Sequence, residues 1–177
     1  MLMVDGHRME FDMFPLSGFY HFGIVVSDFD GALEELSSNL GIEWANTTEF
    51  EIVCEQPNGI VSADMKVVYS TSGPPHYEVI RVAPGTVWGQ ANLGIHHLGF
   101  WTENLQKDHK RLTQSGYTWE STYYNPETDG PFGFTYHTLD NTGLRVELVD
   151  LARKPAFDKW MAGGDFPSAM DPGGMES

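Results

Sequence analysis

The sequence has little cysteine and few basic residues. Cys54 is the only cysteine among 177 residues, so the chain cannot form an internal disulfide bond. We therefore expect a reducing, cytoplasmic compartment. Ten lysine and arginine residues stand against 25 aspartate and glutamate residues, which gives a formal net charge of −15. Nucleic acids and anionic membrane surfaces are bound through clustered basic side chains, so this balance argues against both as partners.

Long apolar runs are also missing. The first 14 residues are interrupted by charged and polar side chains, which argues against a signal peptide. Elsewhere, no run approaches the roughly 20 apolar residues that a membrane-spanning helix requires. The hydrophobic content of 41% is ordinary for a folded domain, and the length suffices for a substantial core. We expect a soluble protein that acts on a small molecule.

One pattern occurs twice in the chain. GFYHFGIVV and GIHHLGFW each form an apolar stretch with a histidine, His21 or His97, followed two residues later by glycine. Such stretches are typical of buried strands. In each copy an acid or amide, Asp28 or Asn104, stands seven residues after the histidine, where it can cap a segment with helical spacing. The sequence therefore predicts a repeated supersecondary unit.

Turn-forming residues divide each unit into the same order of elements: a strand, a helix and three strands. In the first unit, residues 18–82, these elements are predicted at 19–26, 28–40, 43–55, 63–70 and 76–82. In the second unit, residues 94–152, they are predicted at 94–101, 104–115, 117–124, 134–139 and 144–151. The remaining segments are a leader at 1–17, a linker at 83–93, and a tail at 153–177 with a short helix at 155–161 and a loose end from 163. The sequence therefore predicts an α+β fold of two βαβββ modules.

Four side chains with metal-ligand chemistry occupy matching positions in the two units. His21 and His97 lie in the first strands, and Glu78 and Glu147 lie among valine, isoleucine and leucine in the fourth strands. A carboxylate in a half-buried strand is unfavourable unless it is paired or binds a cation. Two imidazoles and two carboxylates suit zinc, nickel, cobalt, manganese or iron. The sequence predicts one divalent-metal site shared by both units; the alternative is a pair of core histidines bonded to the backbone.

Further polar side chains lie near these predicted ligands. His76 and Arg145 each precede a glutamate ligand by two residues, so strand alternation places them on the same side. Arg145 is expected to hold a substrate carboxylate through a bidentate contact, or alternatively to pair with a surface acid. His76 and His137 are further candidates for substrate contact, although only one of His137 and its preceding neighbour can face inward. The same alternation predicts that His96 points away from the adjacent ligand histidine.

The two strand openings and the four ligand-type residues resemble the vicinal oxygen chelate superfamily. Its members include glyoxalase I, methylmalonyl-CoA epimerase, extradiol dioxygenases, and the bleomycin and fosfomycin resistance proteins. The resemblance covers about residues 19–152 and implies two βαβββ modules that curve into a cup of mixed sheet. It also implies that the first and fourth strands point their metal ligands inward, here His21, Glu78, His97 and Glu147. Many relatives dimerise, so a homodimer is possible.

Different features of the sequence resemble two different subfamilies. The two histidines and two glutamates resemble the ligand set of bacterial glyoxalase I. The strand openings are closer to methylmalonyl-CoA epimerase, which usually has glutamine at the position of Glu78. Both subfamilies imply an isomerase, epimerase or lyase that binds its substrate through two oxygens and moves a proton next to a carbonyl.

The catalytic base and the reaction class remain open at this point. Glu78 or Glu147 can leave the metal and act as the base, and Glu55, at the turn after the second strand, is a third candidate whose alternative role is surface solvation. A second reaction class is an extradiol-type dioxygenase on iron, although that class uses three protein ligands. A third reading is a metal-free protein that sequesters an antibiotic in the same cup.

Overall fold

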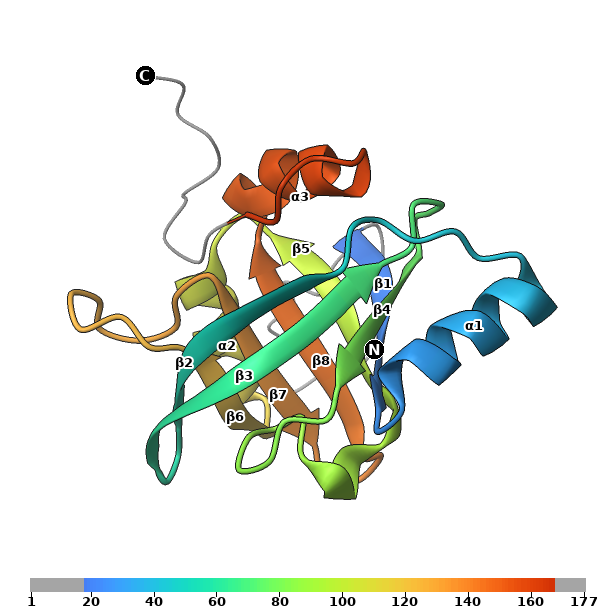
Figure 1. Ribbon diagram of the computed structural model, residues 1–177. Coiled ribbons are helices and arrows are strands. Elements are labelled where there is room, and N and C mark those ends of the chain that lie inside the picture. Colours follow the sequence, from blue (N-terminus) through green and yellow to red (C-terminus); the bar gives the residue numbers. More distant parts are fainter. Residues whose placement is uncertain (1–17, 168–177) are drawn as a thin grey trace, which may run out of the picture.

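The computed structural model describes residues 18–167, which form two βαβββ modules (Figure 1). The predicted leader at 1–17 and residues 168–177 of the predicted tail lie outside the described residues. The first module consists of β1 (Phe19–Val26), α1 (Phe29–Leu40), β2 (Thr48–Gln56), β3 (Gly59–Tyr69) and β4 (His76–Arg81). A 3-10 turn, η2 (Gln90–Asn92), precedes the second module, which consists of β5 (Gly94–Thr102), α2 (Leu105–Gln114), β6 (Tyr117–Tyr123), β7 (Phe134–Leu139) and β8 (Leu144–Asp150). The chain continues into η3 (Leu151–Arg153) and α3 (Lys154–Met161).

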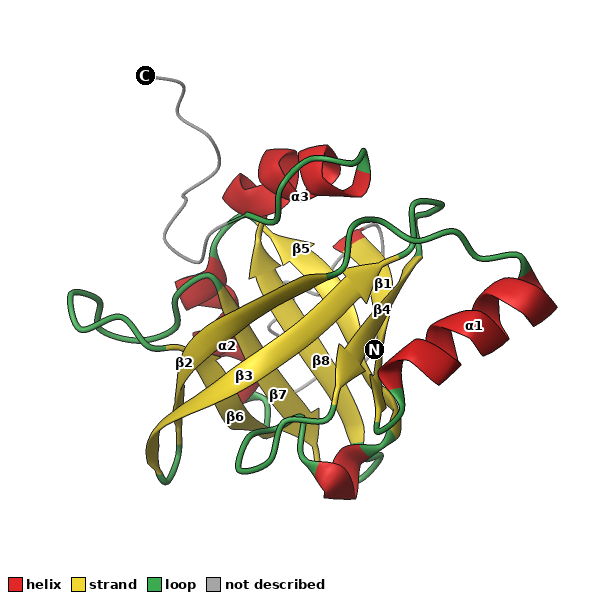
Figure 2. Ribbon diagram, in the orientation of Figure 1, coloured by secondary structure: helices red, strands yellow, loops and turns green. Residues whose placement is uncertain are grey.

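The eight strands form one closed barrel in the order β1-β4-β3-β2-β6-β7-β8-β5. Within each module the first and fourth strands pair in parallel, whereas β1 and β5 pair antiparallel and join the modules. The second seam, between β2 and β6, is short and involves two residue pairs. Helices α1 and α2 lie outside the barrel, and α3 crosses one end of it (Figure 2). The predicted α+β fold with a curved mixed sheet is confirmed.

Both predicted helix starts are capped as expected. The Asp28 side chain accepts a hydrogen bond from the Gly31 backbone N–H at 3.1 Å, and the Asn104 side chain accepts one from the Lys107 backbone N–H at 2.9 Å. Such contacts satisfy N–H groups that have no partner inside the helix. At the other end of α1, Gly41 adopts a left-handed conformation with a φ of 68°. Glycine takes this conformation without strain, which explains why the helix ends there.

The hairpin of β2 and β3 differs from the prediction. The second strand begins at residue 48 rather than 43, and the third begins at Gly59 rather than residue 63. Gln56 pairs with Gly59, so only Pro57 and Asn58 form the turn. Because the turn is this tight, the residues after it pair with β2 at once, and the strand forms earlier than the sequence pattern indicates.

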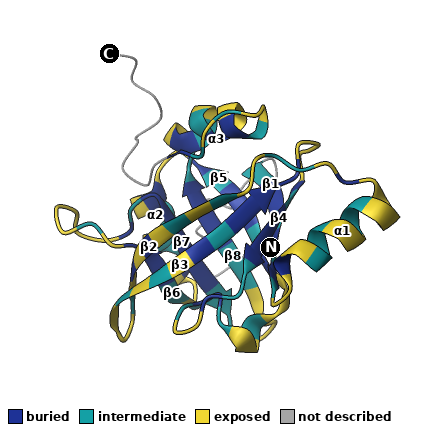
Figure 3. Cartoon of the chain, viewed as in Figure 1, coloured by how far each residue is buried: buried dark blue, intermediate teal, exposed yellow. Residues whose placement is uncertain are grey.

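The barrel interior is the main core, and α3 covers its open end (Figure 3). Phe157 and Trp160 of α3 are buried. Phe166 belongs to the stretch predicted to be loose, yet its ring lies 4.7 Å from that of Trp160 and 4.8 Å from that of Phe50. The tail is therefore packed at least as far as Phe166, because aromatic side chains there continue the core. In the described part of the chain, no helix has the length and apolar character needed to cross a membrane.

Candidate metal centre and cavity

The seam between β1 and β5 contains two irregularities that the sequence pattern does not reveal. The pairing register skips Tyr20 in β1 and His96 in β5, one residue before each predicted histidine ligand. A β-bulge of this kind inserts an unpaired residue and re-aims the side chains beside it. As a result Tyr20, His21, His96 and His97 are all buried. The prediction that His96 points away from His97 is wrong for this reason: its Nδ1 lies 2.9 Å from Nδ1 of His97.

Each glycine of the repeated pattern makes room for the histidine of the other module. Gly23 lies opposite His97 across the seam, and Gly99 lies opposite His21. A Cβ atom at either glycine would come closer than 3.0 Å to three atoms of the facing imidazole ring. Real carbon contacts lie at about 3.5–4.0 Å, so only glycine permits this approach. The spacing from histidine to glycine therefore reflects a reciprocal packing requirement.

The four predicted ligands converge from β1, β4, β5 and β8 on one point in the barrel. Their ligand atoms all lie within 4.8 Å of one another. Nε2 of His21 is 3.1 Å from Oε2 of Glu147 and 3.3 Å from Oε2 of Glu78. Nε2 of His97 is 3.1 Å from Oε2 of Glu78 and 3.4 Å from Oε2 of Glu147, and the two Nε2 atoms are 2.7 Å apart. An ion with bonds of about 2.0–2.2 Å holds neighbouring donors roughly 3 Å apart, so this arrangement fits a metal ion.

The environment of the four ligands supports the same conclusion. Oε2 of Glu78 and Oε2 of Glu147 are buried and accept no well-directed hydrogen bond from any described residue. Burial by itself raises the pKa of both glutamates, but contacts with His21 and His97 outweigh burial and hold each pKa below its ordinary value. Burial likewise lowers the pKa of His97, but both carboxylates outweigh it and raise that pKa to about 9. Ionised carboxylates facing imidazole nitrogens are the donor set of a divalent metal site.

His96 determines which nitrogen of His97 faces the ligand cluster. Nε2 of His96 lies 2.8 Å from the carbonyl oxygen of Val87, which can only accept, so this nitrogen carries the proton. In the neutral ring that burial favours, Nδ1 of His96 is then the acceptor for the N–H of His97 Nδ1. This assignment, made from the hydrogen-bond pattern, directs Nε2 of His97 at the carboxylates. Metal-binding histidines are commonly oriented by such a second hydrogen bond.

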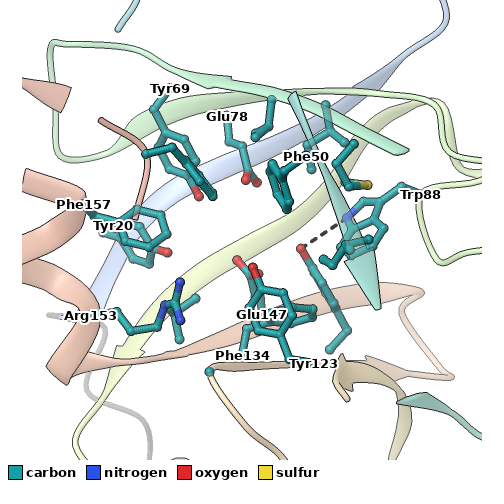
Figure 4. Close-up of a pocket in the computed structure, with 18 residues that line it drawn as sticks. Tyr20, Phe50, Tyr69, Glu78, Trp88, Tyr123, Phe134, Glu147, Arg153 and Phe157 are labelled. Carbon is teal, nitrogen blue, oxygen red and sulfur yellow. Dashed lines mark hydrogen bonds between the residues drawn. The ribbon is translucent and has the colours of Figure 1, made fainter. Parts of the chain in front are cut away.

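A cavity lies beside the four ligands, and Glu78 and Glu147 form part of its wall (Figure 4). Its aromatic lining consists of Tyr20, Phe50, Tyr69, Trp88, Tyr123, Phe134, Tyr136, Phe157 and Phe166. Burial, followed by the charges of the two glutamates, raises the pKa of Tyr20 and Tyr136 well above the ordinary value. These hydroxyls therefore stay protonated at neutral pH and can donate hydrogen bonds to a ligand. Arg153 also lines the cavity, although no sequence pattern indicates it.

Arg145 does not line this cavity, which corrects the position predicted for it. It lies on the same face of β8 as Glu147, but its Nε and Nη2 atoms bind both carboxylate oxygens of Glu120 at 2.6 and 2.9 Å. A bulge in β6 between Trp119 and Ser121 contains Glu120. Arg145 therefore makes its bidentate contact with a carboxylate of the protein and not with a substrate, which agrees with the alternative prediction of an acidic partner.

His137, His76 and Glu55 also lie away from the cavity. Because Phe134 and Tyr136 are the described β7 residues that line the cavity, strand alternation places His137 on the other side of the sheet, where its Nε2 lies 3.0 Å from Nδ1 of His109 in α2. His76 lies at the start of β4, and its Nδ1 donates to the Ser70 carbonyl oxygen at 2.9 Å. Glu55 is exposed on β2, between the buried Cys54 and the half-buried Gln56.

The sequence matches the family model described as the Glyoxalase/Bleomycin resistance protein/Dioxygenase superfamily over residues 20–136. The chain belongs to this superfamily. The match includes three of the four converging ligands, and Glu147 lies after it on β8. The predicted resemblance to the vicinal oxygen chelate proteins, another name for this group, is thereby confirmed. No curated protein matches the sequence.

Two solved structures have a similar fold. Methylmalonyl-CoA epimerase from Mycobacterium tuberculosis superposes with a TM-score of 0.53 and 19% identity, over 78% of this chain and 90% of that chain. The hypothetical protein BH1468 from Bacillus halodurans C-125 superposes with a TM-score of 0.50 and 15% identity, over 75% of this chain and 92% of that chain. At these identities the likeness concerns the fold alone.

Proposed function

We propose that this superfamily member is a divalent-metal-dependent enzyme that binds its substrate through two oxygens and moves a proton next to a carbonyl. Its reaction class would be that of an isomerase, epimerase or lyase. The observation that carries the proposal is the convergence of His21, Glu78, His97 and Glu147, whose ligand atoms lie within 4.8 Å of one another beside a cavity. A bound ion would polarise the substrate carbonyl and make the neighbouring carbon more acidic.

The chain offers two carboxylates that can take the proton. Glu78 and Glu147 both line the cavity, and both are held in the ionised form by the facing imidazoles. Either glutamate can leave the metal and act as the catalytic base, by accepting the proton at a carboxylate oxygen. Tyr20 and Tyr136 stay protonated and can steady a substrate oxygen by donating to it. The exposed position of Glu55 offers no route to a ligand in the cavity.

The resemblance of the strand openings to methylmalonyl-CoA epimerase supports proton transfer as the reaction class, and the fold neighbour from Mycobacterium tuberculosis is an epimerase of that name with a similar fold. With glutamate at position 78 the site has two carboxylates, as does the ligand set of bacterial glyoxalase I, which these residues resemble. Two carboxylates neutralise a divalent ion formally. The substrate therefore need not supply charge to the ion and can bind through neutral carbonyl or hydroxyl oxygens.

Elemental analysis of the full-length protein, purified without chelators, tests the metal. We expect about one divalent ion per chain, and near-complete loss in His21→Ala and Glu147→Gln. Glu55→Gln is the matched control, because it removes a carboxylate that lies outside the site. A wild-type chain that takes up no divalent metal from supplemented medium would contradict the proposal and favour a sequestering protein.

Deuterium incorporation tests the reaction. The metal-loaded protein is incubated in D2O with a panel of acyl-CoA thioesters and α-hydroxy ketones, and solvent deuterium is followed by mass spectrometry. We expect exchange at the carbon next to the carbonyl for at least one compound, dependent on metal and on Glu147. Bound iron with oxygen uptake and no exchange would instead favour the dioxygenase reading.

A further inference from the structure

We propose that the substrate extends from the four converging ligands past Tyr20 into a second hollow beside α3, where a hydroxyl group of the substrate bonds to Nε2 of His76. The inference rests on the proposed function, because it names the substrate class of the same site. The substrate is thus an extended molecule with two chelating oxygens at one end and a hydroxyl group at the other.

The cavity beside the four ligands is too small to hold such a substrate by itself. Its volume is about 50 Å³. An engineered apolar cavity that binds benzene measures about 150 Å³, and pockets for small organic ligands measure about 300–1,000 Å³. A molecule that carries two oxygens, a carbonyl group and an acidic carbon must therefore extend beyond this cavity.

A second hollow lies between α3 and the connection from β3 to β4, which meet at the same end of the barrel (Figure 1). Its volume is about 340 Å³, within the range of ligand pockets. Tyr20 is the one described residue that lines both this hollow and the cavity beside the ligands. The two spaces are therefore neighbours, and the side chain of Tyr20 lies between them.

No hydrogen bond to a described residue fixes the Tyr20 ring in this position. Its hydroxyl is buried and lacks such a partner, although Tyr69 lies close enough to influence its pKa. The ring instead stacks on Trp101, with 3.9 Å between the ring centroids. A ligand can therefore displace the ring and join the two spaces without breaking a hydrogen bond. A ligand oxygen that accepts from the Tyr20 hydroxyl would also remove the cost of leaving this group unpaired.

His76 lies where the far end of an extended substrate would reach. It precedes Glu78 by two residues, so it lies on the same side of β4 and about 7 Å along the strand. It lines the hollow, and its side chain is nonetheless buried, with 9% exposure. A chain of about six carbons spans the distance between the two side chains. The strand geometry therefore sets the length of the substrate.

The contacts of the His76 ring leave one nitrogen for a ligand. Nδ1 lies 2.9 Å from the carbonyl oxygen of Ser70, and a Cβ atom at Gly73 would lie only 2.5 Å from Nδ1, so the ring is tightly packed on this side. No described residue bonds to Nε2. A hydroxyl group can donate to Nε2 of a neutral ring and accept from Nε2 of a charged one. The proposed contact therefore does not depend on the protonation state of His76.

The test uses chelating probes that differ in length and in one hydroxyl group. Zinc-loaded full-length protein is titrated by calorimetry with acetohydroxamate, hexanohydroxamate and 6-hydroxyhexanohydroxamate, which all chelate zinc through two oxygens. We expect both six-carbon probes to bind at least roughly tenfold more tightly than acetohydroxamate, because their methylene groups become buried. The hydroxylated probe should bind roughly two- to tenfold more tightly than hexanohydroxamate, the range of a neutral hydrogen bond. Equal affinities for all three probes would overturn the proposal.

Variants locate the two contacts. His76→Phe should abolish the preference for the hydroxylated probe and leave the affinity for hexanohydroxamate and the metal content unchanged. Met161→Trp fills the hollow from α3, so it should weaken both six-carbon probes and leave acetohydroxamate unchanged. Glu55→Gln, outside both spaces, is the control and should keep every preference. A full hydroxyl preference in His76→Phe would overturn the assignment, and unchanged six-carbon binding in Met161→Trp would do so even where His76→Phe fails to fold.

A metal-free arm separates this inference from the proposed function. Protein stripped with EDTA is titrated with 6-hydroxyhexanamide and with acetamide, and the Cε1–H resonance of His76 is followed by NMR, assigned by its loss in His76→Phe or His76→Gln. A saturable shift with the long amide alone supports the hollow as a binding site even where the protein binds no metal. Metal binding with no such shift leaves the proposed function in place and overturns the extended substrate.

Discussion

Replacing Gly99 by alanine tests the reciprocal packing of the two modules. The new Cβ atom would lie closer than 3.0 Å to Cε1, Nδ1 and Nε2 of His21. Non-bonded carbon atoms need about 3.5–4.0 Å, so the imidazole has to retreat by at least roughly half an ångström. Metal–ligand distances tolerate only about 0.2 Å, and His21 would no longer reach the position set by Glu78 and Glu147. We therefore expect metal affinity to fall by roughly 100-fold or more.

The sign of the stability change is equally informative. Glycine-to-alanine substitution at an unstrained position usually stabilises a protein by about 0.4–1 kcal/mol, because the unfolded chain loses freedom. At Gly99 the steric conflict should reverse this sign and destabilise the metal-free protein by about 1–3 kcal/mol, as overpacking does. For a chain of this length, each kcal/mol lowers the melting temperature by about 2–4 °C. Gly23→Ala should behave in the same way through His97, which faces it.

Two measurements check this prediction. Competition with a chromogenic chelator gives the metal affinity, and thermal unfolding of the stripped protein gives the stability. Gly41→Ala is the control: its φ of 68° is unfavourable for alanine, but no atom lies within 4 Å of the added Cβ. It should lose about 1 kcal/mol of stability and keep wild-type metal affinity. A Gly99→Ala protein with unchanged affinity and higher stability would refute the packing argument.

Three further predictions concern side chains around the site. Burial lowers the pKa of His137 to about 3, so below pH 6.5, the ordinary pKa of histidine, the unfolded chain binds more protons than the folded one. As the pH falls below 6.5, the free energy of unfolding should therefore fall by up to about 1.4 kcal/mol per pH unit. His137→Phe should make the stability measured by urea unfolding depend less on pH. Glu120→Ala should cost about 1–3 kcal/mol in urea unfolding, because it leaves the largely buried Arg145 without its carboxylate, yet should not change ligand affinity measured by calorimetry. His96→Phe should lower metal affinity about 10–100-fold in chelator competition, because Nδ1 of His97 loses its acceptor.

Much of the fold and the ligand set follows from local sequence pattern. The capping residues Asp28 and Asn104 and the stop at Gly41 act within a few residues, so their effect can be read without a structure. His21 and His97 can be predicted to lie together because the same element order repeats and places equivalent positions side by side. The close approach of their ring nitrogens, at 2.7 Å, shows how accurately equivalence in the repeat predicts proximity.

Local sequence pattern does not predict side-chain position where strand register or competition between side chains decides the outcome. Strand alternation assumes regular pairing, and the bulges at Tyr20 and His96 break it, so both side chains turn toward the interior. Arg145 was predicted to face the ligands, and it does lie on their face of β8, but Glu120 satisfies it first. Nothing in the sequence signals Arg153, because it ends the short 3-10 helix η3 after the last strand, which is too short to show a periodicity.

The four converging donor residues and the cavity wall depend on different parts of the structure. The proposed metal ligands and the glycines that admit them come from the repeated β1–β5 seam and from equivalent strands, and each module completes the packing of the other. A substitution that moves the histidine or the glycine in one module therefore requires a compensating change in the other. The cavity wall includes residues with no counterpart in the repeat, among them Arg153 and Phe157. Substitutions in this unrepeated wall can therefore alter which ligand fits the cavity while the seam keeps the four donor atoms in place.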